Sequence, residues 1–209
     1  MRYITQFNPV ILSLITIDFF MNGALGIIAP FFAVFIVNSG QIVGGDIAVI
    51  GFATSIFWLV KSVAQLPIAA WLDKYDGETD EFWAFFMGYI GAAIVPLIYF
   101  FADSPFDIYV AQALFGLAMA LAVPAWTSIF TRHIDHARIS FEWSLYSVFS
   151  LGLATMLSAA LGSILVDQFG FRAIFLIASV VAMISVCGVF AIRKRLFKAK
   201  KMVRITVES

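Results

Sequence analysis

Asp18 and Lys61 are two ionisable residues that the sequence places deep inside long apolar stretches. At 1.5 Å per helical residue, Asp18 would lie roughly 12 Å and Lys61 roughly 16 Å from the same membrane face. A charge near the bilayer centre costs at least about 2.5–3.5 kcal/mol, so such residues usually face a bundle interior and mark a solute or ion path. The sequence therefore favours a transport role for this pair. The alternative is a packing ion pair with no such role.

Three amides extend this polar pattern. Asn22 follows Asp18 by four residues and Gln65 follows Lys61 by four, so each amide shares a helix face with its ionisable neighbour. Gln112, in the fourth apolar stretch, could join the two stripes. Each amide can line a substrate or ion path, or can simply form hydrogen bonds between helices.

Other chemistry has little support in the sequence. His133 and His136 lie close together, with Asp135 between them. No third strong ligand has suitable spacing, so a solvated loop is favoured over a metal site. The one cysteine, Cys187, excludes an intramolecular disulfide and a cysteine-bound cluster. No nucleophile-elbow, zinc-protease or phosphate-loop motif is present. We expect no enzymatic activity, no cofactor or metal, and no nucleic-acid partner.

The elements that must position these residues are six long apolar stretches. Apolar residues make up 62% of the 209-residue chain and charged residues 12%, with a mean hydropathy of +0.98. Each stretch reaches the roughly 20 residues that a membrane-spanning helix needs. The stretches are apolar all round, which favours helices over barrel strands. We predict an all-α membrane protein with a six-helix transmembrane domain over 1–195 and a basic tail over 196–209. The stretches are approximately Val10–Val37, Ile47–Leu72, Phe82–Phe101, Ile108–Thr131, Ser140–Val166 and Phe171–Ile192.

Charge predicts the orientation. Of the 13 basic residues, Lys61 lies inside a stretch and Arg172 on one side of the membrane, while the other eleven fall on the opposite side. The positive-inside rule then places both termini in the cytoplasm of a prokaryotic plasma membrane. The basic tail could also bind anionic lipid headgroups.

Three motifs resemble the N-terminal half of a major facilitator superfamily transporter. After the second stretch, Asp73, Lys74 and Gly77 are similar to the family's gating-loop motif, with one extra residue before the glycine. The segment from Gln112 through Gly116 to Pro124 resembles the fourth-helix motif, and 167–175 resembles the turn that opens the sixth helix. The resemblance implies a transporter that moves a small solute by alternating access.

The departures from the family pattern are specific. Glu78 and Asp80 replace the arginines of the gating loop, and Gln112 replaces the arginine that is often linked to proton coupling. The fifth stretch lacks the proline of the antiporter motif. The chain therefore lacks the usual charges of the gating loop, and its sequence does not support an antiporter assignment.

Family members have twelve spans in two parallel halves, with the substrate site between them. Six stretches correspond to one half, so the resemblance implies a parallel homodimer or a pairing with a second half-transporter. Helices one, two, four and five would form the interface, with three and six toward lipid. The alternative is a scaffold or accessory subunit that retains the fold without transport.

Overall fold

The computed structural model describes residues 8–74 and 78–207, and the side chains of 8–74, 78–193 and 196. The described residues form helices and short links, with no strand among them. The elements are α1 (Pro9–Ile28), η1 (Ala29–Phe31), α2 (Phe32–Asn38), α3 (Ile47–Leu72), α4 (Glu78–Phe101), α5 (Pro105–His133), α6 (Ile139–Tyr146), η2 (Ser147–Leu153) and α7 (Ala154–Val207).

Proline interrupts only the first of the predicted helices. Around Pro30 the α-helix gives way to the 3₁₀ turn η1 before α2 continues, because proline lacks the N–H that an α-helix needs. The helices α3, α4 and α5 run unbroken through Pro67, Pro96 and Pro124. Pro105 begins α5, three residues before the predicted fourth stretch. The Asp107 carboxylate there accepts hydrogen bonds from the backbone N–H and hydroxyl of Ser104, at 3.0 and 2.7 Å.

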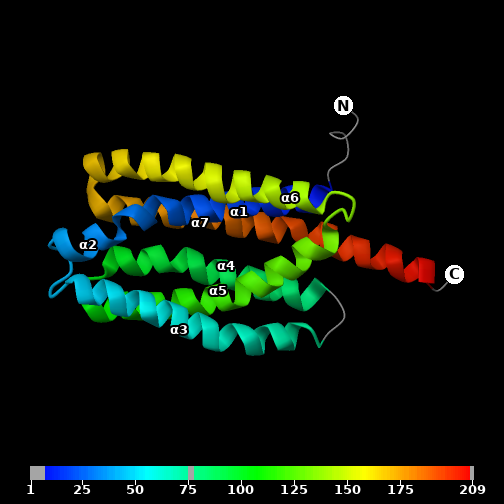
Figure 1. Cartoon of the computed structure of the whole chain (residues 1–209), viewed down its shortest axis with the longest axis horizontal. Coiled ribbons are helices and arrows are strands. Elements are labelled where there is room, and N and C mark those ends of the chain that lie inside the picture. The colour runs from blue at the N-terminus through cyan, green and yellow to red at the C-terminus, as the bar shows by residue number, and fades with distance from the viewer. Residues whose placement is uncertain (1–7, 75–77, 208–209) are drawn as a thin grey trace.

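Five helical stretches of the described chain are long and apolar enough to cross a membrane. The last of them, Ile139–Arg193, has 55 residues. It contains Gly170, whose φ of 77° and ψ of 175° are not helical and separate two helices within α7. Figure 1 shows the chain reversing direction between the yellow and orange parts of α7. Glycine suits this position because a positive φ strains other residues.

The helices pack through small residues and buried hydroxyls. Within α4, Gly88 lies so close to α5 that an added Cβ would be 2.6 Å from the Ala118 carbonyl oxygen. Ser179 of α7 donates a hydrogen bond to the Ala93 carbonyl of α4, at 2.8 Å. Ser185 makes a similar bond across α7 and α1. In membranes, close contact between small faces is a main source of helix association.

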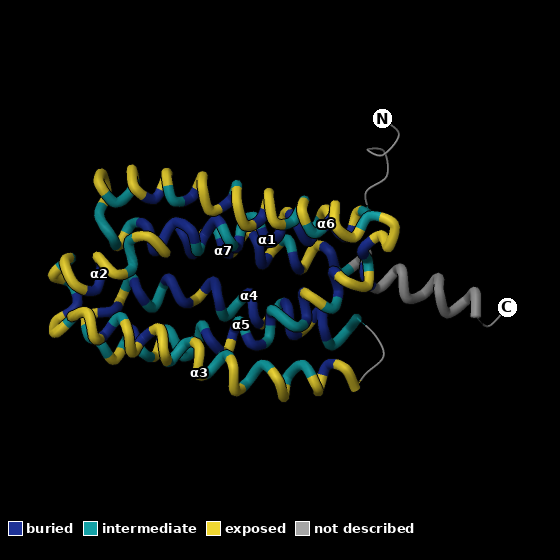
Figure 2. Tube along the Cα trace, viewed as in Figure 1, coloured by how far each residue is buried: buried dark blue, intermediate teal, exposed yellow. Residues whose placement is uncertain are grey.

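The helix α3 lies at the edge of the bundle and packs on α5. Gly116 of α5 marks the contact, since an added Cβ would be 2.6 Å from the Phe57 carbonyl oxygen. Figure 2 shows much of α3 and of the segment after α6 exposed, while α1, α4 and α5 carry most of the buried positions. Large apolar side chains such as Leu66, 76% exposed, cover these outer surfaces. Lipid is the solvent that suits such surfaces.

Candidate functional site

Asp18 lies in the middle of α1 and is only 7% exposed. The Tyr89 hydroxyl of α4 donates to one carboxylate oxygen, and the Asn22 amide donates to the other at 3.1 Å. The Tyr146 side chain, at the end of α6, lies near this carboxylate. Both hydrogen-bond donors, Tyr89 and Asn22, are neutral. The structure therefore brings two predicted site residues, Asp18 and Asn22, together.

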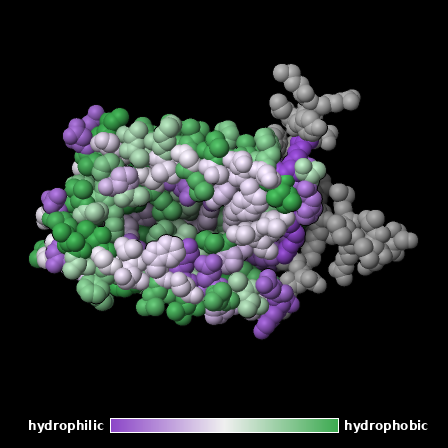
Figure 3. All heavy atoms as spheres, viewed as in Figure 1, coloured by the Kyte–Doolittle hydropathy of each residue, from purple (hydrophilic) through white to green (hydrophobic). Residues whose placement is uncertain are grey.

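A cavity of about 320 Å³ adjoins Asp18 and Asn22. Its walls come from α1, α4, α5 and α6. Figure 3 shows a hollow in the viewed face of the molecule. Four aromatic side chains line it, together with apolar residues such as Met21 and Met119. The aromatic residues are Tyr89, Trp126, Trp143 and Tyr146.

These aromatic residues are not among the site residues that the sequence predicts. Tyr89 offered a usable signal, because a tyrosine in the middle of an apolar helix needs a hydrogen-bond partner for its hydroxyl. Tyr146 lies next to the π-helical segment η2, Ser147–Leu153. Segments of π-helix occur frequently at functional sites, but nothing in the sequence marks this one in advance.

Lys61 lies apart from Asp18. Its Nζ is 4.8 Å from the centroid of the Trp58 ring and 5.8 Å from that of Phe57, both within α3. The described chain has ion pairs at Arg132–Glu81, His133–Glu78 and Arg138–Asp135, and an Asp18–Lys61 pair is not among them. The physical reason is helix placement, since α3 packs on α5 and not alongside α1. A role for Asp18 and Lys61 in a transport path remains a prediction.

The two remaining amides differ in their surroundings. Gln112 of α5 lines a second cavity of about 270 Å³, whose other walls include Leu25, Tyr99 and Phe115. Because Leu25 also lines the Asp18 cavity, the two cavities adjoin the same part of α1. Gln65 is half-buried in α3, one turn beyond Lys61.

The predicted gating loop is only partly described. Asp73 caps the end of α3 through its backbone N–H, which donates to the Ala69 carbonyl at 3.0 Å. Lys74 follows in the same turn, and both side chains are exposed. Gly77 lies outside the described residues.

The acids after this loop bind α5. Glu81 is 2% exposed, and both of its oxygens accept hydrogen bonds from the Arg132 guanidinium, at 2.5 and 2.7 Å. Ser128 donates a third bond, at 2.6 Å. Glu78 lies 3.4 Å from a ring nitrogen of His133. This cluster joins the start of α4 to the end of α5.

The segment 133–136, which contains both histidines, contributes to these contacts between helix ends. The His133 ring contacts the Ile129 carbonyl as well as Glu78, and its own carbonyl accepts a bond from Asn8. Asp135 accepts a hydrogen bond from the Ala137 N–H, at 2.9 Å. His136 is exposed. These contacts are those of a loop that links helix ends.

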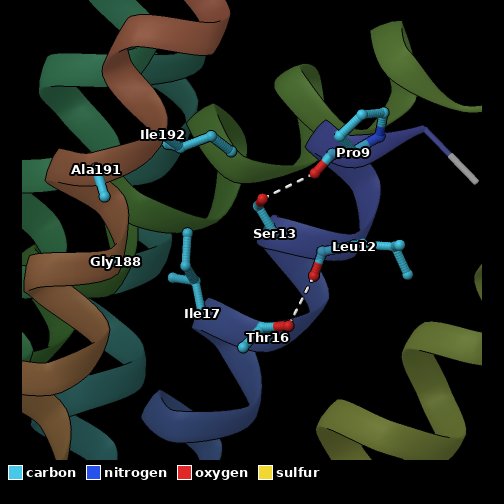
Figure 4. A pocket seen from close by; sticks show the side chains of 8 residues that line it. All are labelled: Pro9, Leu12, Ser13, Thr16, Ile17, Gly188, Ala191 and Ile192. Atoms are coloured by element: carbon cyan, nitrogen blue, oxygen red, sulfur yellow. Dashed lines mark hydrogen bonds between the residues drawn. The ribbon is translucent and has the colours of Figure 1, made fainter.

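A larger crevice, of about 400 Å³, lies between the first half of α1 and residues 188–192 of α7. Figure 4 shows its Ser13 and Thr16 hydroxyls turned back toward the carbonyls of Pro9 and Leu12, at 2.7 and 2.8 Å. Its other walls are apolar and include Ile17, Gly188 and Ile192. It holds no ionisable side chain, so the smaller Asp18 cavity is the better candidate site.

Comparison with known proteins identifies the family. The family model described as Major Facilitator Superfamily matches residues 11–203. The chain therefore belongs to the major facilitator superfamily, and it is a multi-pass membrane protein of the transporter class, not an enzyme. No curated protein and no solved structure is significantly similar to it.

Proposed function

We propose that this protein moves a small solute by alternating access, through a path that includes the Asp18 cavity. The observation that carries the proposal is a buried carboxylate, held by neutral groups, beside a cavity of about 320 Å³ in the bundle of a facilitator-family protein. Ligand sites in helical bundles typically combine apolar walls with a few convergent polar groups. The Gln112 cavity, which adjoins the same part of α1, would continue the path.

We place six spans in the membrane, with 139–166 and 171–193 crossing separately on either side of Gly170. The start of α1 and the end of α5, whose last turn contains Arg132, are joined by a hydrogen bond from Asn8 to the His133 carbonyl and lie at the same end of the bundle (Figure 1). Because basic residues gather there, we assign that end to the cytoplasm of a prokaryotic plasma membrane.

Lys61 supports the presence of a second six-helix unit. It is half-buried in the middle of α3, on the edge of the bundle, with no carboxylate partner among the described residues. Facing lipid, such a charge would cost at least about 2.5–3.5 kcal/mol. A second copy of the chain in the same orientation would enclose α3 and turn this face into the wall of a shared aqueous cavity. A separate partner half would do the same.

Cysteine labelling from both sides tests alternating access. In a Cys187→Ala background, Thr127→Cys reports on the Asp18 cavity and Ala29→Cys on the Gln112 cavity. A transporter exposes the two positions to an impermeant reagent from opposite sides of sealed vesicles. Val180→Cys, at an outer apolar position of α7 that is 64% exposed, is the matched control and should stay unlabelled. A scaffold would leave both cavity positions unlabelled from either side, which would contradict the proposal.

The same approach tests orientation. Cysteines at Ser39, Ser104 and Gln168 should react with the impermeant reagent from outside intact cells, and those at Thr79 and Ala137 only after the membrane is opened. Reaction of Thr79→Cys from outside would reverse the assignment.

Crosslinking tests the second unit. Ser62 of α3 and Ser147 at the start of η2 are both exposed. Chains carrying Ser62→Cys and Ser147→Cys, mixed in lipid, should form a crosslinked dimer. Phe101→Cys and Val180→Cys, on the outer faces of α4 and α7, should not. An active protein that stays monomeric across dilution would place the whole site within one bundle.

A further inference from the structure

The Asp18 carboxylate has hydrogen-bond donors but no counter-charge. Its hydrogen-bond partners are Tyr89 and Asn22, and no lysine, arginine or histidine of the described residues forms an ion pair with it. Burying a carboxylate is costly unless an opposite charge compensates for the lost hydration. The adjoining cavity is the place from which a positive charge could come.

The walls of this cavity suit a particular kind of cation. The rings of Trp143 and Tyr146 lie 6.0 Å apart at 81°, and those of Trp126 and Trp143 lie 6.2 Å apart at 65°. The Trp126 and Tyr146 rings lie closer together, 4.6 Å apart at 39°, so the steeply inclined Trp143 ring forms a corner with this tilted pair. Aromatic faces attract organic ammonium groups through their quadrupoles, most strongly where water is excluded.

A bare metal ion fits less well. Asp18 is the one carboxylate among the residues that line the cavity. Calcium and magnesium take six or more oxygen ligands, and transition metals favour imidazole or thiolate. Most of the remaining lining is apolar, with Met21 and Met119 offering adaptable contacts for alkyl groups.

Trp126 adds a second polar requirement. Its side chain is 7% exposed, and its indole N–H is buried without a hydrogen-bond partner in the described part of the chain. Buried indole N–H groups normally find an acceptor, because an unmet donor costs free energy. A ligand that places an oxygen near this N–H would supply the acceptor.

We propose that the Asp18 cavity binds an organic ammonium ion that also carries a hydrogen-bond acceptor, such as a hydroxyl or carbonyl oxygen. Asp18 neutralises the charge, the rings of Tyr89, Trp143 and Tyr146 surround the alkylated nitrogen, and the Trp126 N–H binds the acceptor. The inference rests on the proposed function and names the substrate class of that site.

Calorimetric titration in phosphatidylglycerol nanodiscs tests this assignment. The probes are choline, tetraethylammonium and 3,3-dimethylbutan-1-ol, the uncharged analogue of choline with carbon in place of nitrogen. Choline should bind at least about tenfold more tightly than the alcohol, because only choline has the charge. Equal affinity for choline and the alcohol, or saturable binding of neither cation, would overturn the proposal.

Two substitutions separate the roles of charge and acceptor. Asp18→Asn should weaken both cations by at least about tenfold and leave the alcohol unchanged. Trp126→Phe should weaken choline about fivefold through the lost hydrogen bond, with tetraethylammonium, which has no acceptor, unaffected. If Trp126→Phe weakens both cations equally, the proposed hydrogen bond between the ligand and the Trp126 N–H is wrong. This variant also keeps the test decisive if Asp18→Asn does not fold.

Nanodiscs of phosphatidylcholine distinguish a free ion from a lipid headgroup. Headgroup binding would lower the apparent affinity for choline in these discs, whereas a site for free ions would keep it. Cation binding without two-sided cysteine labelling would retain the ammonium site and reject transport. Labelling from both sides without cation binding would retain transport and reject the ammonium site.

Discussion

Asp18 and Glu81 are both buried carboxylates, but their partners differ in kind. Glu81, 2% exposed, receives two hydrogen bonds from the Arg132 guanidinium and one from Ser128. Asp18, 7% exposed, receives hydrogen bonds from neutral groups alone and adjoins a cavity. Glu81 is neutralised within the protein and joins α4 to α5. Asp18 remains available to a positively charged ligand.

The two carboxylates therefore differ in role: Glu81 stabilises the packing of two helices, whereas Asp18 adjoins a cavity that can take a ligand. A buried ion pair with complete hydrogen bonding fixes a geometry, and removal of one partner leaves an uncompensated charge. A buried carboxylate without a counter-charge costs stability, and such costs often persist where function requires them. The expected effects of substitution therefore differ in kind at the two sites.

The largest effect should follow Arg132→Met. This change leaves Glu81 buried without its cation, and we expect a loss of about 2–3 kcal/mol, the low end because Arg132 is itself 45% exposed. Glu81→Gln should cost only about 1 kcal/mol, since the freed guanidinium can reach water. Reversible unfolding in mixed micelles measures both. Equal losses would show that the pair is not buried as described.

A second effect tests how tightly the α4–α5 side is packed. Gly88→Ala would bring a Cβ within 2.7 Å of Ala122 Cβ, so we expect a loss of about 1–3 kcal/mol. Gly23→Ala, on α1, meets no atom within 4 Å and should be neutral or stabilising by up to about 1 kcal/mol. The same unfolding assay compares them, and a harmless Gly88→Ala would contradict the close approach.

Removal of a donor from Asp18 should have a smaller effect. Tyr89→Phe takes away one hydrogen bond to the carboxylate and should cost about 1 kcal/mol. Tyr99→Phe is the matched control, because Tyr99 is equally buried in α4 and no hydrogen bond joins its hydroxyl to another described residue. If the two variants unfold alike, Tyr89 does not support the carboxylate.

The smallest expected effect is the coupling free energy between Asp18→Asn and Lys61→Met, which should be near zero. Because Asp18 and Lys61 form no ion pair, the stability changes of Asp18→Asn and Lys61→Met should add to within about 0.5 kcal/mol in the double variant. A larger coupling in the dimer would show that Lys61 of one copy approaches Asp18 of the other.

The sequence was informative where one helix suffices. Apolar length predicted the helices, and the four-residue spacing placed Asp18 and Asn22 on one helix face, where they form a hydrogen bond. It could not predict which helices become neighbours. The bond from Tyr89 to Asp18 spans 71 residues and that from Arg132 to Glu81 spans 51. Such pairs depend on tertiary packing, which no local pattern specifies. For the same reason the sequence could place Asp18 and Lys61 at similar depths but could not show that α3 packs on α5.

Uptake of a labelled organic cation into proteoliposomes tests the central comparison most directly. Choline or tetraethylammonium serves as the solute, and wild type, Asp18→Asn and Glu81→Gln are compared at equal amounts of folded protein. We predict that Asp18→Asn abolishes uptake while the protein remains folded, and that Glu81→Gln transports at a rate close to that of wild type despite its lower stability. Uptake by Asp18→Asn at the wild-type rate would contradict the account.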